Sequence, residues 1–285
     1  LWAASWNFIS AFSFGTGVAR TVGAGLVDLS FVDQHVILAG LFGAIVWNLL
    51  TWWWGLPSSS THALYGGYAG SAIASAGFKS ILWGGWAWIL PFILIAPLIG
   101  LALSYVLMIG VYWAFRSRSP KTMDVWFRKL QLVSAAAFSY SHGTNDAQKT
   151  MGIITGALVT AKYLDSFDVP VWVILAAHAA IALGTMAGGW RIVHTMGGRL
   201  TRLKPRSGFC AETAAAVSIL FSTELKMPVS TTHTVAGAIA GVGSIQRFKA
   251  VRWGVATNIL WAWALTIPAS ATVGWIMMQV IKPFR

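Results

Sequence analysis

Leu56-Pro57-Ser58-Ser59-Ser60-Thr61-His62-Ala63-Leu64-Tyr65-Gly66 has a second copy further along the chain, Met227-Pro228-Val229-Ser230-Thr231-Thr232-His233-Thr234-Val235-Ala236-Gly237. The proline, the hydroxyl run, the histidine and the final glycine all match at one offset (228 − 57 = 171). Proline suits the first turn of a helix, and serine or threonine side chains cap its free N–H groups. Each copy, here called a hydroxyl motif, therefore predicts a turn that leads into a helix N-terminus.

The composition indicates a membrane protein. Of the 285 residues, 56% are hydrophobic, 10% are charged and 17 are tryptophan, and the mean hydropathy is +0.67. A soluble domain carries about 25% charged residues. In so apolar a chain the net charge of +12 indicates basic cytoplasmic loops, and we expect no nucleic-acid partner. The single cysteine, Cys210, excludes an intramolecular disulfide and a cysteine-based metal cluster.

Long apolar runs give the candidate membrane spans. They are Val36–Trp54, Ile81–Phe115 with kinks at Pro91 and Pro97, Leu130–Ala161, Val169–Trp190 and Trp253–Ile281. A short helix rich in small residues follows each hydroxyl motif, and we expect two re-entrant helical hairpins there rather than full spans. The fold class is thus an all-α integral membrane protein with broken helices.

The two motifs divide the chain into two repeats. We place the first repeat at 1–115, a basic cytoplasmic linker loop at 116–129 and the second repeat at 130–285. Residues 20–34 hold one base and two acids, whereas 191–206 hold five bases and no acid. Because basic loops favour the cytoplasm, the two copies are expected to have opposite orientations. Inverted-topology repeats of this kind are typical of secondary transporters, which bind substrate near the bilayer midplane.

The hydroxyl runs, Ser58–Thr61 and Ser230–Thr232, are the first candidate site. Two inverted copies would direct two helix N-termini toward one point, where N–H groups, hydroxyls and positive dipole ends suit a tetrahedral oxyanion. The alternative is ordinary capping and helix packing by serine and threonine.

The second candidate is the polar segment His142–Lys149, which we expect to interrupt an apolar span. A carboxylate at membrane depth, Asp146, is costly unless a cation or a proton accompanies it. Oxygen donors from Thr144, Asn145 and Gln148 suit sodium, and Asp146 could also carry a proton. The alternative is a polar loop at the membrane surface.

Five further side chains have supporting or structural interpretations. His62 and His233 could donate to the anion, titrate, or fix the hairpins through backbone carbonyls. Lys149 could contact substrate or extend to the membrane surface. Glu212 and Glu224 are buried acids in this interpretation, and both are expected to be structural.

At these residues the sequence resembles the PiT family of inorganic phosphate transporters. Its Asn-Asp signature resembles Ser141-His142-Gly143-Thr144-Asn145-Asp146-Ala147-Gln148-Lys149-Thr150-Met151-Gly152, and both hydroxyl motifs match. The resemblance implies cation-coupled phosphate uptake, inverted repeats and often a homodimer. It also implies the phosphate ligands Ser59, Ser60, Thr61, Ser230, Thr231, Thr232, Asn145 and Asp146. The first-half Asn-Asp segment would fall before Leu1 (145 − 171 = −26), so we expect about 30 or more N-terminal residues to be missing.

The leading hypothesis is therefore a multi-pass phosphate transporter of the bacterial inner membrane. It would take up phosphate with sodium or protons by alternating access. A possible bound sodium ion is the only non-protein group we expect. The alternatives are a sulfate permease of the same fold, an anion channel, and a membrane-embedded hydrolase, which the lack of a strained Gly-x-Ser-x-Gly turn disfavours.

Overall fold

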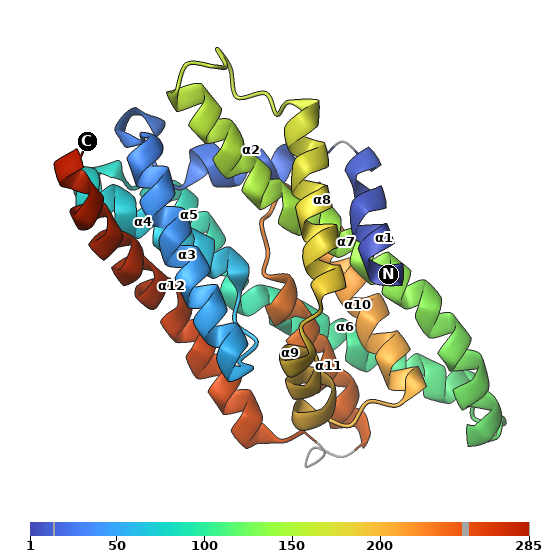
Figure 1. Cartoon of the computed structure of the whole chain (residues 1–285). Helices are drawn as coiled ribbons and strands as arrows, with labels where there is room; N and C mark the ends of the chain where they lie inside the picture. The colour runs from blue at the N-terminus through green and yellow to red at the C-terminus, as the bar shows by residue number, and fades with distance from the viewer. Residues whose placement is uncertain (14, 247–250, 285) are drawn as a thin grey trace.

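The computed structural model describes residues 1–13, 15–246 and 251–284, and this part of the chain is almost entirely helical (Figure 1). Its only extended pairing is an isolated antiparallel bridge between Val27 and Ile81. The elements are α1 (Trp2–Ile9), η1 (Ser10–Ser13), α2 (Gly17–Gly25), η2 (Leu29–Phe31), α3 (Gln34–Trp54), α4 (Ser60–Ala76), η3 (Phe78–Ser80), α5 (Trp83–Ile89), α6 (Phe92–Ala114), α7 (Pro120–Thr160), α8 (Val171–Ala187), α9 (Trp190–His194), the π-helix η4 (Thr195–Leu200), α10 (Pro205–Glu224), α11 (Thr231–Gln246), α12 (Trp253–Ile281) and η6 (Lys282–Phe284).

Three stretches are long and apolar enough to cross a membrane: α3, α5 with α6, and α12 with η6. A fourth arises if α8 and α9–η4, which are bent by 66° relative to each other, form one broken span. Large apolar side chains are exposed on these helices, including Leu94 at 67% and Trp113 at 72%. Such a surface is stable against lipid rather than water. The predicted all-helical membrane fold and the spans Val36–Trp54 and Trp253–Ile281 are therefore confirmed.

Helix α7 differs from the expectation in two respects. It runs without a break for 41 residues, from Pro120 to Thr160, so residues 120–129 are helical rather than part of a loop, and His142–Lys149 does not interrupt the helix. The Ser119 side chain accepts a hydrogen bond from the Thr122 N–H at 3.2 Å, and with Pro120 at the first helical position it starts the helix early. Residues 20–34, whose charges were compared above with those of 191–206, are also partly helical, because α2 extends to Gly25.

Each small-residue helix packs against a long helix of the other half of the chain. α4 lies along α12, and α11 lies along α6. Backbones approach closely at matching positions: a Cβ added at Gly66 would collide with the Ile267 carbonyl oxygen, and one at Gly237 with the Pro97 carbonyl oxygen. Packing of this kind needs small residues. The two glycines are one repeat offset apart (237 − 66 = 171), and their contact partners differ from that offset by one residue (267 − 97 = 170). The two-repeat division and the inverted orientation stay predictions.

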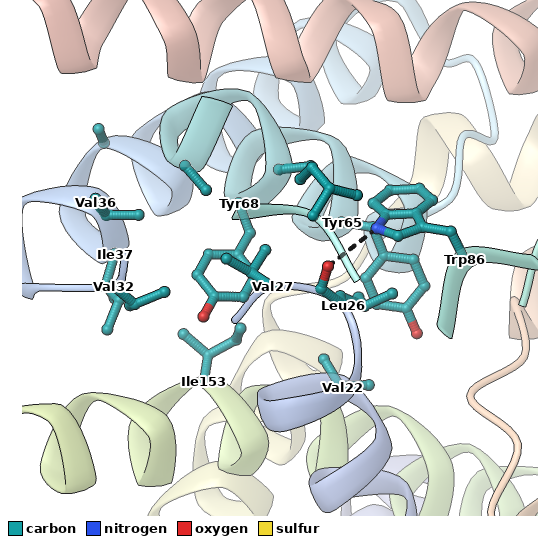
Figure 2. Packing of buried hydrophobic residues seen from close by; sticks show 14 of the residues in the cluster. Val22, Leu26, Val27, Val32, Val36, Ile37, Tyr65, Tyr68, Trp86 and Ile153 are labelled. Atoms are coloured by element: carbon teal, nitrogen blue, oxygen red, sulfur yellow. Dashed lines mark hydrogen bonds between the residues drawn. The ribbon is translucent and has the colours of Figure 1, made fainter. Parts of the chain in front are cut away.

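A buried apolar cluster holds the first hydroxyl motif in place (Figure 2). Tyr65 and Tyr68 of α4 pack there with Val22 and Leu26 of the α2 region and with Ile153 of α7. The Trp86 indole N–H donates to the Leu26 carbonyl at 3.2 Å. Between helices in a membrane such a cluster stabilises through close van der Waals packing and hydrogen bonds. The cluster therefore links the first half of α4 to the α2 region and to Ile153 of α7.

Candidate functional site

The Lys149 ammonium joins the two hydroxyl motifs. Lys149 is 3% exposed, and its Nζ donates to Thr61 Oγ1 at 2.7 Å, to the Val229 carbonyl at 2.6 Å and to Asp146 Oδ1 at 2.6 Å. All three ammonium donors are thus used. The alternative in which Lys149 extends to the membrane surface is wrong, because its partners hold it between the two motifs.

Asp146 lies on the same face of α7, since residues three and four apart are neighbours on a helix. Its Oδ2 accepts a hydrogen bond from Thr231 Oγ1 at 2.9 Å and lies 3.2 Å from His142 Nε2. The other His142 nitrogen, Nδ1, is 3.0 Å from Asn7 Oδ1. A carboxylate, an ammonium, an imidazole and two threonine hydroxyls therefore form one network, here called the Asp146–Lys149 network.

Asn145 and Gln148 tie α7 to its neighbours, whereas the Thr144 hydroxyl donates within the helix to the Ser141 carbonyl at 2.9 Å. Asn145 Nδ2 donates to Thr223 Oγ1 at 2.8 Å and to the Met227 carbonyl at 3.2 Å. Gln148 Oε1 accepts from the Val18 N–H at 2.9 Å, and its Nε2 donates to the Thr144 carbonyl at 2.7 Å. Within the described ranges no hydrogen bond connects these side chains to Asp146, so the predicted coupling-ion residues fall into two groups.

Asn145 nevertheless leaves one oxygen unused. Its Oδ1 is buried and has no hydrogen-bond partner among the residues described. An unpaired buried acceptor costs about 1–3 kcal/mol, and it suits a hard cation. Amide and carboxylate oxygens such as those of Asn145 and Asp146 are ligands that a hard cation like sodium prefers, but the two residues are adjacent on one helix and their side chains do not face each other. The described residues contain no cluster of three or more His, Cys, Asp or Glu side chains that could hold another kind of metal.

The two serines that precede the helices act as N-caps. Ser59 Oγ accepts from the His62 N–H, and Ser230 Oγ from the His233 N–H, each at 3.2 Å. Capping, the alternative interpretation of the motifs, is thus observed at these two serines. Ser60 is exposed and Thr232 is half-buried, so these two hydroxyls remain accessible.

A cavity of about 760 Å³ opens beside the network and is called the site cavity here. Ser60 of the first motif lines it together with His142, Asp146 and Thr150 of α7. Ala177 and Thr185 of α8 are also part of its wall. One hydroxyl of the first motif and the carboxylate thus face a common space, whereas the described lining of this cavity includes no residue of the second motif. An anion site built from both motifs stays a prediction.

The histidines of the two hydroxyl motifs, His62 and His233, lie in contact with each other. The His62 and His233 ring centroids are 4.7 Å apart, and His233 stacks on Trp263 at 3.7 Å. The Trp263 N–H donates to the Pro57 carbonyl at 3.0 Å. These rings therefore pack the two motif turns against each other.

Some side chains differ from the expectation or were missed. Glu224 is exposed rather than buried. Glu212 is largely enclosed and accepts from Ser134 at 2.5 Å and from Gln131 at 3.3 Å. Asn7, which also donates to Thr185 Oγ1 at 3.0 Å, was missed, although a lone amide in an apolar helix is a usable signal.

Comparisons with known proteins assign the chain to a family. The model of the Phosphate transporter family matches residues 1–274. A "probable low-affinity inorganic phosphate transporter" from Rhizobium meliloti (strain 1021) is 52% identical over 273 residues, 95% of this chain and 82% of that protein. The protein of the same description from Bacillus subtilis (strain 168) is 44% identical over 98% of this chain and 85% of its own length.

A solved structure has the same fold. "The sodium-dependent phosphate transporter" superposes with a TM-score of 0.89 at 23% sequence identity, over 100% of this chain and 90% of that one. The resemblance inferred from the motifs and the expectation of a non-enzyme are confirmed by the family match. The chain is an integral membrane protein that belongs to the phosphate transporter family.

Proposed function

We propose that this protein is a secondary active transporter that takes up inorganic phosphate by symport with a cation, sodium or a proton, through alternating access. Its place would be the bacterial inner membrane, as a multi-pass protein and a homodimer. The observation that carries the proposal is the Asp146–Lys149 network, which joins both hydroxyl motifs through buried charges beside a cavity. The family and the names of the relatives support phosphate as the substrate.

The network suggests how phosphate and cation would be coupled. Lys149 and Thr231 both direct donors at Asp146. A proton or sodium ion on Asp146 would weaken these two interactions and release the Lys149 ammonium and the Thr231 hydroxyl. Phosphate oxygens would accept from the released donors and from Ser60, Thr61 and Thr232. Cation and anion would then favour each other's binding, which is a coupling free energy.

The cation would be held by oxygens of residues 144–148 in α7. Asp146 supplies the charge, and Asn145 Oδ1 supplies a buried oxygen without a protein partner among the described residues. Thr144 and Gln148 are the further candidate ligands. Sodium coordinated there would neutralise Asp146 as a proton would, so both coupling ions remain part of the proposal.

Alternating access would use the contacts between the two motifs. Among the described residues, α7 is bonded to the second motif through Asn145, Asp146 and Lys149 and to the first through Lys149 alone. Replacing the Lys149–Thr61 bond with a phosphate oxygen would loosen the first motif from α7. We propose that the two halves then rock about the His62–His233 contact.

Sulfate is the alternative substrate within the same fold, because hydroxyl and N–H donors also fit that oxyanion. An anion channel is disfavoured, since the charged network closes the space between the motif tips. A hydrolase is disfavoured by the family and by geometry. Ser59 and Ser230 serve as helix caps, whereas a nucleophilic serine needs a histidine side chain that takes its proton.

Uptake of labelled phosphate by proteoliposomes tests the proposal. We expect accumulation with an inward sodium or proton gradient, and little competition from equimolar sulfate. Gradient-independent flux would overturn symport, and equal inhibition by sulfate would overturn phosphate selectivity.

Lys149→Gln should lose at least tenfold in uptake, since a hydrogen bond to a charged group contributes about 1.5–3 kcal/mol. Lys129→Gln, at an exposed position of α7, is the matched control.

A further inference from the structure

A basic, tryptophan-lined pocket lies where α3 ends and α9 begins; Figure 1 shows these two helix ends in the lower half of the molecule. Its volume is about 500 Å³, and its walls include Trp53, Trp54, Trp190, Arg191, His194 and Arg199. It shares no residue with the site cavity except Trp190. We call it the arginine pocket.

Arg191 is fixed in this pocket by its backbone and aromatic contacts. Its Nη1 donates to the Trp53 carbonyl at 2.6 Å, and its guanidinium lies 4.8 Å from the Trp53 ring centroid and 5.9 Å from that of Trp52. Thr195 Oγ1 donates to the Gly55 carbonyl at 2.9 Å. Because a guanidinium has five N–H donors, most of those on Arg191 remain available to a ligand.

The pocket has positive charge without a balancing acid. No aspartate or glutamate is part of its wall, and within the described ranges neither Arg191 nor Arg199 forms an ion pair with a carboxylate. The guanidinium fork matches phosphate oxygens in geometry and charge. The arginine pocket therefore suits a phosphate group that arrives with its own negative charge.

An apolar groove of about 290 Å³ lies between α6, α11 and α12. Leu200, the residue after Arg199, lines it together with Leu98, Trp253, Leu260 and Trp263. Trp263 is also bonded to Pro57, two residues after the Gly55 that lines the arginine pocket. Arg199 thus lines the basic pocket, and the next residue, Leu200, lines the apolar groove.

We propose that the arginine pocket and this groove form a binding site for one anionic phospholipid, with the phosphodiester between Arg191 and Arg199 and an acyl chain in the groove. The position agrees with a membrane interface, because an apolar span ends at Trp52–Trp54 and tryptophans gather at that depth. Basic pockets between membrane helices bind anionic headgroups in this way. The excess of bases in 191–206 predicts that this end faces the cytoplasm.

Native mass spectrometry of the whole chain in neutral detergent tests this site. Phosphatidylglycerol and phosphatidylcholine are titrated separately and the protein–lipid adducts are counted. Each arginine near a membrane surface should contribute about fivefold, so we expect an overall preference of about 30-fold for phosphatidylglycerol. Arg191→Gln/Arg199→Gln should remove that preference. Arg128→Gln/Lys129→Gln removes the same charge at exposed positions of α7 and should retain it.

Three outcomes would overturn the proposal. These are equal binding of the two lipids, an unchanged preference in the arginine double variant, and loss of the adduct on adding millimolar inorganic phosphate, which would identify a site for free phosphate. If the double variant fails to fold, Arg199→Gln alone decides, because the Arg199 side chain makes no hydrogen bond in the described structure; we expect about a fivefold loss. The readout is lipid binding, so it is independent of the outcome of the uptake experiment.

Discussion

The two hydroxyl motifs form the same turn from partly different residues. The Leu56 N–H donates to the Thr51 carbonyl at 2.9 Å, and at the repeat offset the Met227 N–H donates to the Ser222 carbonyl at 2.8 Å. The caps by Ser59 and Ser230 also match. Local sequence therefore determines the turn and the helix start in both halves.

The two motifs differ in what they offer to α7. Thr231 bonds Asp146, whereas its counterpart Ser60 (231 − 171) faces the site cavity. Thr61 bonds Lys149, whereas its counterpart Thr232 is half-buried with no side-chain hydrogen bond in the described structure. A repeated motif thus acquires two roles, because α7 presents different side chains to the two copies. The difference between the motifs resides in tertiary contacts rather than in the turn.

The largest effect is expected from removing the charge that links the motifs. Asp146→Asn leaves the Lys149 ammonium buried without its carboxylate, and breaking such a pair costs about 3–5 kcal/mol. Phosphate uptake in proteoliposomes should fall by at least 100-fold, and the thermal midpoint in detergent should fall as well. Asp165→Asn, at an exposed loop position, is the control. Normal uptake by Asp146→Asn would show that the two motifs act without this link.

A smaller and symmetric effect is expected at the helix crossings. Gly66→Ala and Gly237→Ala place a Cβ against the carbonyl oxygens of Ile267 and Pro97, and overpacking costs about 1–3 kcal/mol. The thermal midpoints of both variants should fall by similar amounts. Gly110→Ala is the control, because a Cβ there meets nothing within 4 Å. A loss in only one of the two variants would mean that the crossings are not equivalent.

The local features of the fold could be predicted from the sequence, but the side-chain contacts of the site could not. Proline and hydroxyl spacing predicted where α4 and α11 begin, and α12 matches its predicted range, Trp253–Ile281. The break expected at His142–Lys149 was wrong because the polar side chains there find partners on other elements, so the helix keeps its backbone bonds. Such partners are separated widely in sequence, as for Lys149 and Thr61 (149 − 61 = 88). The repeat spacing predicted that the two motifs lie close together, but it contains no information about which side chains of α7 they contact.

The smallest predicted effect is at the residue that directly precedes each hydroxyl motif. Gly55 and its counterpart Lys226 both adopt left-handed backbone conformations, with φ of 67° and 58°. The left-handed backbone conformation costs a residue with a side chain about 1 kcal/mol of conformational free energy, whereas glycine adopts it without this cost. Gly55→Ala should therefore destabilise the protein by about 1 kcal/mol, although the nearest atom to the new Cβ is 3.5 Å away. Lys226→Gly should stabilise it by a similar or smaller amount, because the more flexible unfolded chain offsets part of the gain. Thermal midpoints in one detergent measure both variants, and shifts of the same sign would contradict the equivalence of the two turns.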